Sequence, residues 1–131
     1  MATEQISELL SLAAGEDLSA KQFYGLKLSV SSRDTVVLPN AVNQVFFGVL
    51  QNDPTSGQAA QIATRSGDIS KIISRGDVAT IAIGDRLTLH SDGTFVKAQT
   101  DGQNFAGIAM QASTSSGNLI NMLIQPGMSG A

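Results

Sequence analysis

The sequence predicts a compact all-β domain, either a sandwich or a barrel. Turn-forming residues recur about every 8–12 residues along the chain, and no long amphipathic helix pattern is present. The third observation is a strand–loop–strand pattern that occurs twice, at residues 48–62 and 107–122. Each copy has a short apolar run, a polar loop that ends at Gly57 or Gly117, and a second run with interleaved polar residues. This pattern is typical of a β-hairpin.

The first half of the chain begins with an ambiguous segment, residues 1–12. Ile6, Leu9 and Leu10 have helical spacing, whereas Leu10, Leu12 and Ala14 alternate as they would in a strand. We predict an extended N-terminal arm over residues 1–12 that ends in a short strand, followed by a β domain over residues 13–125. Four strands are expected in this half, at residues 23–30, 35–38, 48–51 and 58–62.

The second half is expected to form six strands, at residues 68–74, 78–83, 86–90, 95–96, 107–111 and 118–124. Asp92-Gly93 predicts a two-residue hairpin loop, because both residue types tolerate positive φ. The last strand is apolar on both faces, so it is expected to lie centrally in a sheet or against a partner. Residues 126–131 are predicted to form a frayed C-terminal tail.

The composition restricts the functions available to this chain. Its 131 residues suit one domain, and the lack of cysteine excludes a disulfide framework and a thiolate site. The net charge is −3 and the eight basic residues are scattered singly, which argues against nucleic-acid binding. The apolar runs are far shorter than the ~18 residues that span a membrane. Because no signal-peptide pattern follows Met1, we expect synthesis and use in a cytoplasm.

The ionisable residues predict turns and no catalytic centre. The single histidine, His90, has no second histidine or cysteine with which to share a metal ion. Asp85, Asp92 and Asp101 could pair as a general acid and base, but each adjoins a glycine, as tight turns require. We therefore expect no catalytic residue, metal ion or cofactor. Arg75-Gly76-Asp77 matches a cell-attachment tripeptide, but its place between two predicted strands favours a structural turn.

Several motifs taken in order resemble one protein family. These are residues 14–23 with Leu26-Lys27-Leu28, then Gly48-Val49-Leu50-Gln51-Asn52-x-Pro54, then Ile83-Gly84-Asp85-x-Leu87 with Asp92-Gly93, and finally Gly107-Ile108-Ala109 with Gly117-x-x-Ile120. Together they resemble the capsid decoration (cement) proteins of tailed phages over about residues 13–124. The resemblance implies a small β-barrel-like or β-tulip domain and no enzymatic activity. It also implies a homotrimer bound to the major capsid protein at three-fold and quasi-three-fold positions of the expanded head.

Two surfaces are predicted for that role. The arm could add a strand to an edge of the capsid protein, with Ile6, Leu9, Leu10 and Leu12 as apolar anchors. Residues 102–131 carry no charge, so the last hairpin lies either in the middle of a sheet or in a subunit interface. For the second case we predict that Leu119, Asn121 and Leu123 face the trimer partner.

The expected location is the outer surface of the virion head, assembled in the host cytoplasm, with no nucleic-acid or membrane partner. The alternative is a receptor- or glycan-binding β module on the virion, which would use the Ser/Thr-rich loops or Arg75-Gly76-Asp77. The absence of tryptophan and the single tyrosine weigh against sugar binding, which favours aromatic platforms. An enzyme using Asp85 or Asp92 is the third hypothesis.

Overall fold

A computed structural model describes residues 4–41, 44–98 and 103–128. This part of the chain is all-β and contains no helix, which confirms the predicted fold class and leaves no helix able to cross a membrane. Its ten strands are β1 (Leu10–Ala14), β2 (Gly25–Leu28), β3 (Thr35–Val37), β4 (Gly48–Leu50), β5 (Ala59–Ala63), β6 (Ile69–Arg75), β7 (Arg86–Leu89), β8 (Phe95–Lys97), β9 (Asn104–Ala109) and β10 (Ser116–Met128).

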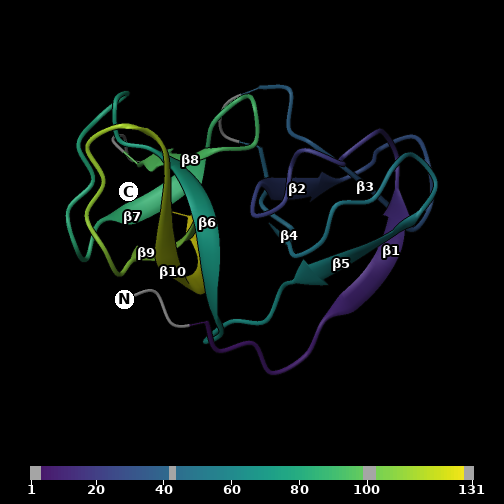
Figure 1. Cartoon of the computed structure of the whole chain (residues 1–131), viewed down its shortest axis with the longest axis horizontal. Helices are drawn as coiled ribbons and strands as arrows, with labels where there is room; N and C mark the ends of the chain where they lie inside the picture. Colours follow the sequence, from purple (N-terminus) through teal and green to yellow (C-terminus); the bar gives the residue numbers. More distant parts are fainter. Residues whose placement is uncertain (1–3, 42–43, 99–102, 129–131) are drawn as a thin grey trace.

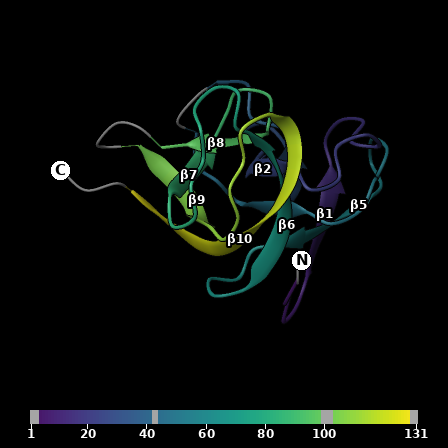
Figure 2. The same cartoon turned by 60° about the vertical axis from the view of Figure 1, so that its left-hand side comes forward.

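The strands form two five-stranded closed barrels that lie side by side (Figure 1). The first barrel has the order β1-β3-β2-β4-β5 and the second has the order β6-β8-β7-β9-β10. In both, the first strand is parallel to the third, and every other pairing is antiparallel. The second barrel therefore repeats the topology of the first. Figure 2 shows β10 as a long curved strand that wraps around the second barrel.

The two barrels also share their strand register. Leu26 pairs with Gly48 in the first barrel, and Leu87 pairs with Gly107 at the same place in the second. Leu50 pairs with Ile62, as Ala109 pairs with Met122. We call two residues equivalent when they occupy the same register position in the two barrels. The two copies of the sequence pattern are thus β4–β5 and β9–β10, which confirms both predicted hairpins.

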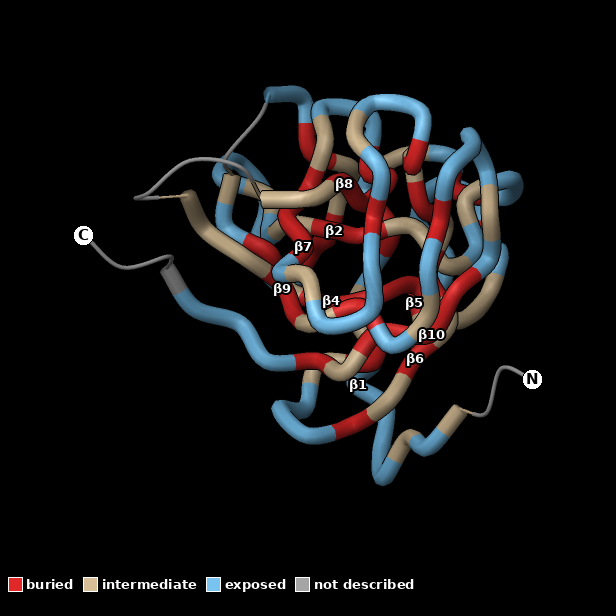
Figure 3. Tube along the Cα trace, turned by 90° about the vertical axis from the view of Figure 1, so that its left-hand side faces the viewer, coloured by how far each residue is buried: buried red, intermediate tan, exposed pale blue. Residues whose placement is uncertain are grey.

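Burial follows the alternation of the strands, with buried residues concentrated where the barrels meet and inside each barrel (Figure 3). One core cluster belongs to the first barrel and consists of Ala14, Leu18, Leu26, Val36, Leu50, Ala60 and Ile62. The other fills the second barrel, but it also contains Phe46, Val49 and Ala63 from the first. The barrels therefore share apolar packing and are not independent units.

The joint between the barrels is built on a row of small or apolar residues. Gly25, Val49 and Ala63 are cross-strand neighbours on β2, β4 and β5. A Cβ atom at Gly25 would overlap Leu89 Cδ2 and would lie 2.8 Å from Phe95 Cζ, so only glycine permits this close approach. The Gly25 amide also donates to the Gly93 carbonyl at 2.7 Å.

Two strand predictions need correction. Residues 78–83 form no strand; only Ile81 makes an isolated bridge, to Ser113. The alternation there reflects a buried Ile81 beside a turn in which the Asp85 carboxylate accepts from the Ala82 amide at 2.8 Å. The Asp92 hairpin is confirmed, but its loop has three residues, because His90 N donates to Thr94 O at 2.8 Å. Gly93 alone adopts positive φ there, at 89°.

The predicted domain boundaries fall inside strands. β1 already begins at Leu10, and β10 continues to Met128. The preceding residues lie along the second barrel: Gln5 bridges to Ile69, and the Ser7 amide donates to the Asp68 carboxylate at 3.0 Å. Residues 1–3 and 129–131 lie outside the described residues.

Candidate interaction surface

The acidic side chains of the candidate acid–base pair are engaged in turns. Asp85 pairs with Lys97 at 3.6 Å and also caps the turn at Ala82. Asp92 accepts hydrogen bonds from the Thr94 amide, at 3.0 Å, and from the Thr94 hydroxyl. Asp101 lies outside the described residues. Within the described ranges, no group of three His, Cys, Asp or Glu side chains could hold a metal ion.

The environment of Asp92 shifts its pKa. Burial raises the pKa of this carboxyl, but the Thr94 hydrogen bonds and the charges of His90 and Arg75 outweigh burial and leave the pKa below its usual value. Because the folded pKa is depressed, this hairpin contributes stability above the ordinary aspartate pKa. That contribution is lost as the pH falls through the lowered value.

Arg75-Gly76-Asp77 folds back on itself at the end of β6. The Arg75 guanidinium donates two hydrogen bonds to the Asp77 carboxylate, at 2.8 and 2.9 Å, and a third to Asp92 at 3.4 Å. The hydrogen bond from Arg75 is the main cause that lowers the pKa of Asp77. Gly76 packs directly on Ser113, where a Cβ atom would overlap the Ser113 backbone. The tripeptide is therefore a structural turn, with its two charged side chains paired to each other.

An apolar groove lies on the first barrel. The groove holds about 400 Å³ and is lined by Lys27, Leu28, Val30, Gln44, Val45, Phe46 and Phe47. Val30 and Val45 are 96% and 70% exposed, so apolar side chains dominate an accessible surface. Exposed apolar clusters of this kind mark interaction sites on otherwise polar proteins. No feature of the sequence was assigned to this groove, although the consecutive apolar residues Val45-Phe46-Phe47 indicate an exposed apolar segment.

The four predicted capsid anchors do not form one surface. Ile6 packs against the core of the second barrel, and Leu12 lies half-buried against the core of the first. Leu9 and Leu10 are 44% and 41% exposed and are available to a partner. Because the neighbouring backbone at Gln5 is bridged to β6, this segment lies along its own molecule.

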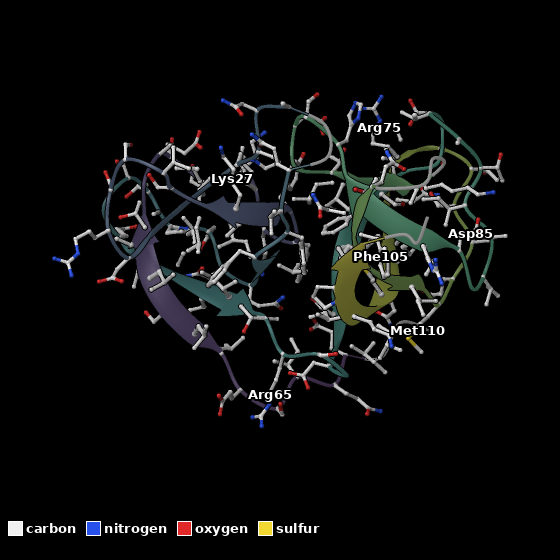
Figure 4. The ribbon with its side chains drawn as sticks, turned by 180° about the vertical axis from the view of Figure 1, so that it is seen from behind. Lys27, Arg65, Arg75, Asp85, Phe105 and Met110 are labelled. Atoms are coloured by element: carbon white, nitrogen blue, oxygen red, sulfur yellow. The ribbon has the colours of Figure 1, made fainter. Side chains whose placement is uncertain are left out.

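The three predicted trimer residues occupy alternate positions on the outer side of β10. Leu119 is exposed and Leu123 is half-buried, whereas Asn121 between them is buried. Leu119 pairs with Ile73 and Leu123 pairs with Ile69, both half-buried on β6. Leu123 also pairs with Ile108 of β9, so half-buried aliphatic side chains continue across three strands. Figure 4 shows Phe105 and Met110 on this same barrel.

Comparison with known proteins finds similarity in structure and none in sequence. No protein-family model matches the chain, and no curated protein sequence matches it. A solved structure described as the head fiber gp8.5 N base in bacteriophage phi29 is similar, with a TM-score of 0.67 and 21% sequence identity. The similarity covers 89% of this chain and 92% of the phage chain. At this identity the comparison shows a shared fold across nearly the whole of both chains.

Proposed function

We propose that this protein is a non-enzymatic bacteriophage head protein, a decoration subunit that binds the major capsid protein on the outer surface of the expanded head as a homotrimer. The observation that carries the proposal is the fold shared with a phage head fiber base along nearly the full length of both chains. The ordered motifs of the cement family support the same role. Asp85, Asp92 and Arg75-Gly76-Asp77 are held in turns, whereas the groove at Val30 and Val45 exposes apolar side chains to a partner.

Stabilisation of the head needs no chemistry. A ligand that binds one state of a protein and not another stabilises the bound state by mass action. A trimer presents three copies of one capsid-binding patch, so modest contacts add up to strong attachment through effective concentration. Two barrels that share a core provide a rigid body on which to hold such patches.

The direct test measures assembly and binding together. Size-exclusion chromatography with light scattering is expected to give three times the subunit mass. Co-sedimentation is expected to recover the protein with expanded heads and not with unexpanded ones. A monomer at high concentration that also fails to bind expanded heads would contradict the proposal. The receptor- or glycan-binding alternative predicts instead a signal on a glycan array that depends on intact loops.

Leu9 and Leu10 are the predicted anchors best placed to contact the capsid. We expect the double variant Leu9→Asp/Leu10→Asp to weaken head binding about tenfold or more, since a charge opposes apolar burial at each of three copies. Point variants are preferable to deletion of residues 1–12, which would remove part of β1. Ile83→Asp is the matched control, because Ile83 is 73% exposed in another loop. Equal head affinity of the Leu9/Leu10 variant and the wild type would reject the arm as a capsid contact.

A further inference from the structure

Within the chain, one outer face of the first barrel contacts one end of the second barrel. In the first barrel, the row Gly25, Val49 and Ala63 covers one end of the second barrel, at Leu89 and Phe95. All three residues of the row are buried in the folded chain. We call this row of the first barrel, and its equivalent in the second, the docking row.

The docking row of the second barrel is only partly covered. Its residues are Arg86, Ile108 and Leu123, which are cross-strand neighbours at the equivalent register positions. Arg86 is exposed, and Ile108 and Leu123 are half-buried, whereas their equivalents Val49 and Ala63 are fully buried. The Arg86 guanidinium lies over the Phe105 ring, 5.1 Å from its centre.

The end of the first barrel that corresponds to Leu89 and Phe95 is uncovered at Leu28, whereas Val36, the equivalent of Phe95, is buried in its own barrel. Leu28 pairs with Val36 as Leu89 pairs with Phe95, so these pairs are equivalent. Leu28 is 48% exposed, whereas Leu89 is 1% exposed. Leu28 also lines the apolar groove together with Val30 and Val45. The first barrel thus exposes Leu28 at the end that would receive a docking row, and the docking row of the second barrel has no partner within the described residues.

The two surfaces offer one pair of opposite charges, Arg86 and Asp34. Within the chain, the Gly25 amide donates a hydrogen bond to the Gly93 carbonyl across the joint. The equivalent of Gly25 is Arg86, and the equivalent of Gly93 is Asp34, one residue before β3 as Gly93 precedes Thr94 and β8. Both Arg86 and Asp34 are exposed, so the same docking would place opposite charges together. In that arrangement an ion pair between chains would take the place of the glycine pair inside the chain.

We infer that the docking row Arg86–Ile108–Leu123 of one subunit binds the Leu28 end of the first barrel in a second copy of the chain. This inference rests on the proposed homotrimer and names its interface. The contact is heterologous, joining two different faces, so three copies close a ring if the rotation between them permits. It also gives a role to Leu123, one of the predicted trimer residues.

The contact between subunits would differ from the internal joint in one respect. At the joint, the Ile73 amide of β6 donates to the Phe23 carbonyl of the first barrel at 3.1 Å. The equivalent of Ile73 is Ala13, whose amide already donates to the Asp34 carbonyl of its own barrel, also at 3.1 Å. Side chains would therefore carry the contact between subunits, and single substitutions should weaken it measurably.

Cysteine cross-linking tests the inferred contact directly, because the wild-type chain contains no cysteine. Gly25 approaches Leu89 at the joint, so the equivalent pair between subunits is Arg86 and Leu28. We expect a mixture of Leu28→Cys and Arg86→Cys proteins, treated with a short bismaleimide, to give a covalent dimer that neither variant gives alone. The double variant is expected to give covalent trimers.

Charge variants supply a second readout. Arg86→Asp is expected to raise the dissociation constant of assembly about tenfold or more, while Arg86→Lys, which keeps the cation, should stay within about threefold of the wild type. Circular dichroism of both variants checks that the barrels remain folded. A wild-type trimer without cross-linking between positions 28 and 86, or cross-linking equally efficient within each single variant, would overturn this contact alone. A monomeric wild-type protein would overturn the homotrimer as well.

Discussion

Replacing Phe95 by alanine is expected to lower the free energy of unfolding by about 3–5 kcal/mol, the usual cost of deleting a buried aromatic ring. Phe95 is 0% exposed and lies where the barrels meet. Its ring contacts Phe46 of the first barrel edge to face, with centroids 5.9 Å apart and an interplanar angle of 68°. Its loss leaves a cavity at the joint, so both barrels should be destabilised together. Urea unfolding followed by circular dichroism measures the effect.

Phe105→Ala is the matched control for Phe95→Ala. Phe105 is half-buried on β9 and contacts Arg86 at the surface, so its removal creates no enclosed cavity. We expect this variant to lose about 1 kcal/mol or less, in the range typical of surface positions. Equal losses for the two variants would show that the joint does not hold the fold together.

The second large effect is expected at Gly107. A Cβ atom there would overlap the Leu123 carbonyl oxygen of the paired strand β10, and would lie 2.9 Å from Met122 Cγ. The nearest obstacle is backbone, which cannot move without separating β9 from β10. Gly107→Ala should therefore cost about 3 kcal/mol, the upper part of the range for overpacking. Thermal or urea unfolding, read by circular dichroism, checks this value.

Two further glycines sharpen that test. Gly48 is the equivalent of Gly107, and its Cβ atom would lie 2.8 Å from the Ala63 carbonyl oxygen, so Gly48→Ala should be similarly damaging. Gly127 is exposed on β10, and a Cβ atom there would meet mainly the edge of the half-buried Phe105 ring. Gly127→Ala is expected to cost less than about 1 kcal/mol. A Gly107 variant as stable as the Gly127 variant would contradict the proposed backbone clash.

Hairpins were predictable from the sequence because their signals are local. Gly48 and Gly107 opened the repeated pattern, and both prove to be positions where only glycine fits between paired strands. The duplication of the whole barrel was not predictable, because it depends on pairings between distant segments. The parallel pairing of β1 with β3 joins Ala14 to Val36, and no short motif encodes it. Residues 78–83 were misassigned because alternation alone cannot distinguish a strand from a loop that buries one residue.

The interaction surfaces were only partly accessible to sequence reasoning. The uncharged C-terminal hairpin pointed to the outer side of β10, where Leu119 and Leu123 do face outward. The burial of Asn121 and the packing of Ile6 against the second barrel depend on tertiary contacts that periodicity does not specify. The apolar groove brings Leu28 together with Val45, residues far apart in the chain. Such a site exists only once the barrel has closed.

The shared core cannot be completed until the second half of the chain has been translated. The first barrel leaves the ribosome before β6–β10 exist, with Val49 and Ala63 lacking the neighbours that later cover them. Every nascent copy exposes the same apolar residues, so the second barrel of another chain can compete with the chain's own second barrel for this surface. Only residues 64–68 separate β5 from β6, and so short a tether gives the chain's own second half a millimolar effective concentration. Docking of the two barrels within one chain should therefore be faster than exchange of barrels between chains.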